Sequence, residues 1–138
     1  MSQENVELHY RVIDAVNRRD LDAVLTVMDD DVESVSRIVA VEGGLHGHDG
    51  YRRWWENWFD VWPDYNIEVL EVRDLGNMTV AALRALGHGA ASTLPFEDTI
   101  WQASRWRRGK CVWWRNFDSQ DEALEAVGLS EQDAHADC

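Results

Sequence analysis

Cysteine and basic side chains are scarce in this chain, and each shortage excludes a class of protein. Two cysteines in 138 residues cannot form a disulfide framework, so we expect free thiols and a cytoplasmic location. The chain has only 13 Lys and Arg residues against 26 Asp and Glu residues, which gives a net charge of −13. Such a field repels phosphate groups, so we expect neither nucleic acid nor a membrane surface as a partner.

Long apolar runs are missing as well. No window approaches the roughly twenty apolar residues of a membrane span, and residues 1–5 lack the basic start of a secretory signal. The sequence has no Gly-rich phosphate loop, no nucleophile elbow and no metal-ligand spacing. We therefore expect a protein that works without a cofactor or a bound metal.

Tryptophan, in contrast, is abundant. The chain has eight, and half of them lie between Trp54 and Trp62. Spacings of three and four residues place Tyr51, Trp55, Trp58 and Trp62 on one side of a predicted helix. A side this apolar must pack as core or form the wall of a cavity for a small apolar ligand. The spacing leaves both interpretations open.

The hydrophobic period changes along the chain from helical to alternating. It predicts helices and strands in this order: helices over 3–18 and 21–28, a strand over 32–41, the aromatic helix up to 62, strands over 66–75, 78–88, 98–107 and 110–117, and a helix over 121–127. The acidic residues 29–31 are predicted to form a turn. This order indicates an α+β fold with helices on one face of an antiparallel sheet. We expect one domain over residues 1–129 and a flexible polar tail over 130–138.

Six short segments resemble the SnoaL-like branch of the nuclear-transport-factor-2-like superfamily. They are Ser2-Gln3-Glu4-Asn5-Val6, Asn17-Arg18-Arg19-Asp20-Leu21-Asp22-Ala23, residues 29–33, Gly47-His48-Asp49-Gly50, Gly109-Lys110 and residues 122–129. The resemblance implies a cystatin-like conical barrel, with a curved antiparallel sheet packed on N-terminal helices. It also implies a pocket on the concave face. The fold hosts isomerases, cyclases, hydrolases and non-catalytic domains, so it does not fix the activity.

On this fold, strand alternation assigns side chains to faces. Trp114, Asn116 and Asp118 are expected on the concave face, with Asp98 and Gln102 beside them on the neighbouring strand. Such positions suit residues that contact a ligand.

The opposite, convex face is expected to carry Cys111, Trp101, Trp113 and Phe117. Exposed aromatic residues of this kind are costly on a monomer. We therefore expect a homodimer through Trp101, Trp113 and Phe117.

The family resemblance also suggests catalytic residues. The base of the isomerase-like relatives corresponds to Ser36, which cannot act as a base alone, and Gln102 takes the place of an oxyanion donor. Asp98 and Asp118 could supply the two carboxylates that an epoxide-hydrolase-like reaction needs, although caps or turns at strand ends are the commoner use for such residues. His46 offers proton transfer at the cavity mouth, or a structural role.

Two functions therefore remain open. One is a cofactor-free isomerase, cyclase or hydrolase that acts on a small apolar substrate by acid–base chemistry. The other is a non-catalytic domain that binds such a molecule or dimerises. A cone filled completely by tryptophan is a third outcome. The expected ligand-binding residues are Ser36, Tyr51, Trp55, Trp58, Gln102, Trp114 and Asn116.

Overall fold

Helices and strands follow one another in nearly the predicted order. The computed structural model describes residues 2–35, 45–88 and 95–128. Its helices are α1 (Ser2–Asn17), α2 (Leu21–Val27), α3 (Gly47–Val61) and α4 (Gln120–Ala126). Its strands are β1 (Met28–Val35), β2 (Leu45–His46), β3 (Asn66–Asp74), β4 (Met78–His88), β5 (Pro95–Arg107) and β6 (Lys110–Phe117). The predicted tail, 130–138, lies outside the described residues, and the domain boundary at 129 stays a prediction.

The strands form one curved sheet in the order β2-β1-β6-β5-β4-β3. All neighbours are antiparallel except β1 and β6, which run parallel. The α+β class is confirmed, but the sheet is mixed, and β2 and β3 at its edges do not pair to close it. The parallel pair arises because β1 enters the sheet beside the last strand of the chain.

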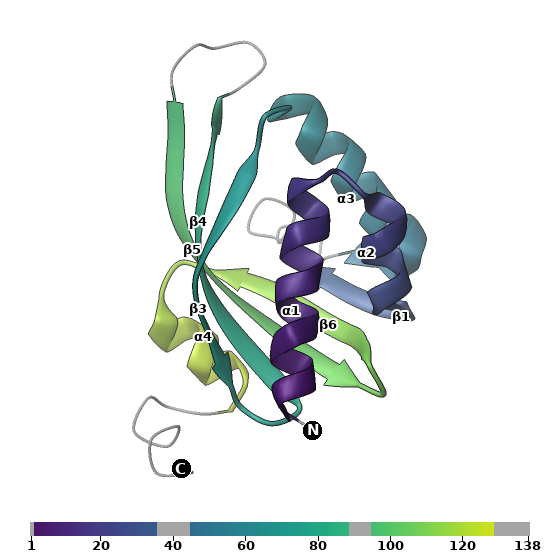
Figure 1. The fold of residues 1–138 in the computed structure, drawn as a ribbon, viewed down its shortest axis with the longest axis vertical. Coiled ribbons are helices and arrows are strands. Elements are labelled where there is room, and N and C mark those ends of the chain that lie inside the picture. Colours follow the sequence, from purple (N-terminus) through teal and green to yellow (C-terminus); the bar gives the residue numbers. More distant parts are fainter. Residues whose placement is uncertain (1, 36–44, 89–94, 129–138) are drawn as a thin grey trace.

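The three N-terminal helices and α4 lie on opposite faces of the sheet (Figure 1). Helix α1 crosses β3 and β4, whereas α3 contacts β1 and β2. The main hydrophobic core lies between these helices and the concave face of the sheet. No helix in the described residues is long and apolar enough to cross a membrane.

Local signals explain the helix and strand boundaries. Asp20 caps α2, because its carboxylate accepts a hydrogen bond from Ala23 N at 3.1 Å. Gly76, with φ of 85°, turns the chain between β3 and β4, and Gly109, with φ of 76°, turns it between β5 and β6. Asn17 pairs through its side-chain amide with both backbone groups of Ile67, each at 2.8 Å, and so joins α1 to β3.

The prediction of a turn at the acidic residues 29–31 is wrong, because they belong to β1. The pairing of β1 with β6 is irregular between Met28 and Glu33. Asp30 and Asp31 are exposed in this irregular stretch. The strand continues through this stretch while the Asp30 and Asp31 carboxylates stay exposed to solvent.

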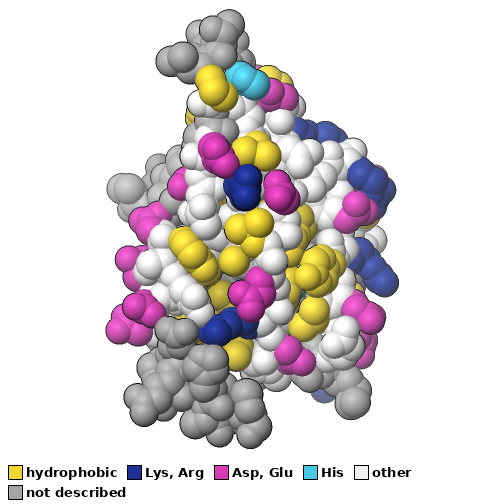
Figure 2. Space-filling model, turned by 60° about the vertical axis from the view of Figure 1, so that its left-hand side comes forward, with side chains coloured by type: hydrophobic (Ala, Val, Ile, Leu, Met, Phe, Trp, Pro, Cys, Tyr) yellow, Lys and Arg dark blue, Asp and Glu magenta, His cyan; other side chains and the backbone are white. Residues whose placement is uncertain are grey.

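The outer face of the sheet carries the aromatic residues that the alternation placed there. Phe117 is buried, and Trp101 and Trp113 are partly buried, in a second core cluster with Ala123 and Leu124 of α4. Figure 2 shows hydrophobic side chains gathered on this side of the molecule, with charged side chains among them. Because α4 covers part of the patch, the exposure that motivated the expected homodimer is smaller than predicted. The homodimer itself stays a prediction.

Candidate functional site

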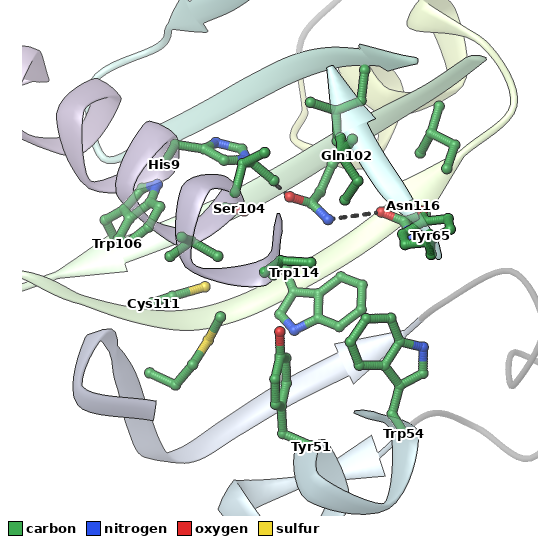
Figure 3. Close-up of a pocket in the computed structure, with 17 residues that line it drawn as sticks. His9, Tyr51, Trp54, Tyr65, Gln102, Ser104, Trp106, Cys111, Trp114 and Asn116 are labelled. Atoms are coloured by element: carbon green, nitrogen blue, oxygen red, sulfur yellow. Dashed lines mark hydrogen bonds between the residues drawn. The ribbon is translucent and has the colours of Figure 1, made fainter. Parts of the chain in front are cut away.

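A small cavity lies between the sheet, α1 and α3 (Figure 3). Its volume is about 30 Å³, which is room for one or two water molecules. The cone is therefore nearly filled by side chains. The 17 residues that line the cavity are His9, Val12, Ile13, Val16, Met28, Tyr51, Trp54, Tyr65, Ile67, Leu83, Ile100, Gln102, Ser104, Trp106, Cys111, Trp114 and Asn116.

Aromatic rings form one wall of the cavity. The Trp54 ring meets the Trp114 ring edge-on at 5.5 Å between centroids, and Tyr51 lies 5.3 Å from Trp54 and 6.1 Å from Trp114. On its other side Trp54 stacks on Trp58 with an interplanar angle of 11°. Trp54 is only partly buried, whereas Trp114 and Trp106 are 3% and 4% exposed. Trp54 is thus the outermost tryptophan of the wall.

A chain of buried and partly buried hydrogen bonds forms another wall. Trp106 Nε1 donates to Thr79 Oγ1 at 2.8 Å, and Thr79 Oγ1 lies 2.7 Å from His9 Nδ1. His9 Nε2 lies 2.9 Å from Gln102 Oε1, and Gln102 Nε2 donates to Asn116 Oδ1 at 3.1 Å. Since the Gln102 oxygen can only accept, His9 carries its proton on Nε2, and its Nδ1 accepts from the Thr79 hydroxyl. Both ring nitrogens of His9 are occupied.

The described residues that line the cavity carry no charge at neutral pH. Among them there is no Asp, Glu, Lys or Arg. Burial lowers the pKa of His9 to about 4 and raises the pKa of the Cys111 thiol to about 12. Burial also raises the pKa of the Tyr51 hydroxyl well above its usual value. These three groups therefore stay neutral, and the site can offer apolar contacts and hydrogen bonds.

Four predicted ligand-binding residues, Tyr51, Gln102, Trp114 and Asn116, line the cavity together. The two other predicted tryptophans, Trp55 and Trp58, do not line it. Trp55 is buried in the core, where its ring meets Phe59 at 4.7 Å, and Trp58 is partly buried. Trp54, three residues after Tyr51, lines the cavity in their place.

The predicted catalytic residues lie outside the cavity lining. Asp118 follows β6 and is exposed, and Asp98 is partly buried on β5 opposite Ala85. His46 precedes α3, with its Nε2 atom 3.7 Å from an Asp31 carboxylate oxygen at the surface. In the described part of the chain, no group of three or more His, Cys, Asp or Glu side chains could hold a metal ion. Ser36 lies outside the described residues.

One inward residue, Cys111, was predicted to face outward, and this prediction was wrong. The pairing of β5 with β6 shifts between Arg105 and Trp106, which face Trp113 and Cys111 respectively. The bulge adds Val112 to β6, and alternation is broken there. Cys111 and Trp114 therefore both reach the cavity.

Sequence reasoning missed His9 altogether. A usable signal exists, because His9 lies three, four and seven residues before Val12, Ile13 and Val16, on the buried face of α1. A histidine on such a face needs buried partners, which Thr79 and Gln102 provide.

Comparison with known proteins agrees with this fold. The model of the SnoaL-like domain family matches residues 10–115, and the chain belongs to this family. No curated protein sequence matches the chain.

Solved structures share the fold. A putative SnoaL-like polyketide cyclase from Jannaschia sp. is 18% identical with a TM-score of 0.76, and the match covers 91% of this chain and 90% of that one. IdmH, a putative polyketide cyclase from Streptomyces antibioticus, is 19% identical with a TM-score of 0.71 over 90% and 98% of the two chains. A hypothetical protein with a ketosteroid isomerase-like fold from Catenulispora acidiphila, in complex with trimethylamine, is 16% identical with a TM-score of 0.73 over 89% and 93% of the two chains. Identities this low show the fold alone.

Proposed function

We propose that this protein binds a small, uncharged and largely apolar molecule in the cavity, and that no cavity residue acts as a general acid or base. The observation that carries the proposal is the neutral lining. General acid–base catalysis needs a titratable group with a pKa near the working pH. His9, with a pKa of about 4, is far from that range, and both of its nitrogens already have partners.

The lining also favours a neutral ligand over a charged one. An ion that leaves water for an apolar cavity loses its hydration, and no opposite charge among the lining residues replaces it. The aromatic rings would favour a cation through cation–π contacts. A cation is therefore the sharpest competing ligand, and the experiment must include one.

Ligand entry requires the wall to move, because binding pockets for ordinary small molecules measure about 300 Å³ or more. Trp54 is the residue we expect to move. It is partly buried, and its outer neighbour is the parallel ring of Trp58, which does not line the cavity. Trp54→Ala removes one wall side chain, while Trp58→Ala removes an indole of the same size from outside the cavity and is the matched control.

The test is a thermal-shift measurement with benzyl alcohol, benzylammonium and benzoate, three molecules of similar size and different charge. A ligand at about 100 times its Kd stabilises the folded state by roughly 2.7 kcal/mol. We expect benzyl alcohol to raise the Tm by several degrees. Trp54→Ala should reach this shift at a lower benzyl alcohol concentration than the wild type or Trp58→Ala. A larger shift with benzylammonium would replace the proposal with a cation site. The absence of any shift in Trp54→Ala would overturn it.

A further inference from the structure

One segment of the chain differs in charge from all the rest. Residues 99–117, which cover most of β5, the turn after it and β6, contain no Asp or Glu, whereas the whole chain has a net charge of −13. Four of the eight tryptophans lie in this segment. Its basic residues are Arg105, Arg107, Arg108, Lys110 and Arg115. The hairpin of β5 and β6 is therefore a positive region on a negative protein.

The hairpin turns part of this set away from the cavity. Trp106 and Trp114 line the cavity, whereas Trp113 lies on the convex face, directly opposite Arg105, and is only partly buried. The four arginines of the segment are all exposed. We call these arginines and the partly buried tryptophan the hairpin surface, and its members are Arg105, Arg107, Arg108, Trp113 and Arg115.

Aromatic rings hold two of the arginines in place. Arg105 Cζ lies 5.8 Å from the centre of the Trp113 ring, and Arg115 Cζ lies 5.2 Å from the centre of the Phe117 ring. A guanidinium over an aromatic ring is attracted to it and keeps its N–H donors for other partners. Among the described residues no carboxylate pairs with either guanidinium. Because Arg105 lies opposite Trp113 and Arg115 opposite Ala103, the two arginines are diagonal neighbours, about 7–8 Å apart at the backbone.

Few carboxylates lie near the hairpin surface. Among the described residues that pair with the hairpin on β1 and β4, Glu33 is the only acidic one, and it is exposed opposite Trp113. The exposed carboxylates of α4 belong to the other end of β6. Figure 1 shows α4 beside the end of β6, whereas the turn of the hairpin lies at its beginning. The positive charge around this turn is therefore not neutralised by the described strands and helices.

A partner for this surface needs negative charge over a short length. Arginine binds carboxylates through two parallel hydrogen bonds, and Trp and Arg are enriched at the centres of protein interfaces. Electrostatic fields are screened within about 8 Å at physiological ionic strength, so a short segment is attracted by the hairpin surface and is little repelled by distant carboxylates. A nucleic-acid duplex or an anionic membrane extends past the hairpin surface and meets the acidic remainder of the protein.

We propose that the hairpin surface docks a short acidic segment of another protein. Carboxylates of the segment bind Arg105 and Arg115, and an apolar side chain of the segment packs on Trp113. This inference goes beyond the proposed function and does not depend on a ligand in the cavity, because the hairpin surface lies on the opposite face of the sheet.

The test measures the Kd of a fluorescein-labelled peptide of Glu-Glu-Leu repeats by fluorescence anisotropy. A control peptide has glutamine in place of each glutamate. The hairpin variant carries Arg105→Glu and Arg115→Glu. The matched control, the helix variant, carries Arg52→Glu and Arg53→Glu, which make the same change in net charge at exposed arginines of α3. An unchanged Tm shows that each variant is folded.

We expect saturable binding of the glutamate peptide to the wild type, with a Kd that rises with salt. The hairpin variant should raise this Kd at least tenfold, the helix variant should change it by no more than about twofold, and the glutamine peptide should bind at least tenfold more weakly. No saturable binding, or equal losses in the two variants, would refute the proposal.

Two further measurements test the other possible occupants of the hairpin surface. Tighter binding of a DNA duplex or of phosphatidylserine vesicles than of the peptide would overturn the choice of a protein segment. Sedimentation of the protein alone tests for a second copy. Self-association that the hairpin variant abolishes would assign the surface to that copy and overturn the proposal, whereas a monomer in both proteins supports it.

Discussion

Acid sensitivity is the most quantitative consequence of the buried His9. Its pKa is about 4 in the folded protein and 6.5 when unperturbed, with burial as the main cause. The unfolded chain therefore binds a proton between these values that the folded chain does not. The stabilisation from a neutral His9 is fully present above pH 6.5 and is lost as the pH falls toward 4. The total loss is about 3 kcal/mol, at about 1.4 kcal/mol for each pH unit.

The variant that isolates this effect is His9→Gln, because glutamine keeps a hydrogen-bonding side chain in the cavity wall and cannot titrate. Unfolding by urea, followed by tryptophan fluorescence, gives the free energy of unfolding at pH 7 and pH 4.5. Between these values the wild type should lose about 2–3 kcal/mol more than His9→Gln. His46→Gln, at an exposed histidine, should follow the wild type. Parallel losses in wild type and His9→Gln would refute the assignment of His9 as a neutral buried group.

Two further predictions concern stability. Arg19→Ala should lower the free energy of unfolding by about 2–3 kcal/mol, because its guanidinium donates to the carbonyls of Pro63 and Tyr65 and lies 4.1 Å from the Phe59 ring centre. Arg18→Ala, which breaks only exposed ion pairs, should change it by less than about 0.5 kcal/mol in the same urea titration. Ser119→Ala should cost about 1 kcal/mol, measured by thermal unfolding, because Ser119 Oγ caps α4 through Glu122 N at 3.2 Å. Equal losses for both arginine variants, or an unchanged Tm for Ser119→Ala, would contradict these roles.

The fold could be predicted because local signals and long-range packing agree. The bounds of β4 and β6 match the predicted strands residue for residue, since alternation runs between tight turns at Gly76 and Gly109. The parallel pairing of β1 with β6 could not be predicted, because the alternation that identifies a strand does not specify which other strand pairs with it.

The site could be predicted only in part. Tyr51, Gln102, Trp114 and Asn116 reach the cavity as alternation and spacing indicated. Trp54 shows why the other cavity residues could not be predicted. Neighbouring tryptophans on a helix lie close in angle around its axis, so spacing alone does not decide which of them reaches the cavity. A bulge has the same effect on a strand, and it brought Cys111 inward. Both are set by tertiary packing rather than by the local sequence.

The central claim is that a neutral ligand occupies an uncharged cavity, and one titration tests it most directly. The Kd for acetophenone is measured at several pH values between 5.5 and 9 for the wild type and Trp54→Ala. Because His9 and Cys111 change charge near pH 4 and pH 12, we expect saturable binding with a constant Kd across this range. A tenfold change in Kd with an apparent pKa between 6 and 8, or no saturable binding to either protein, would contradict the account.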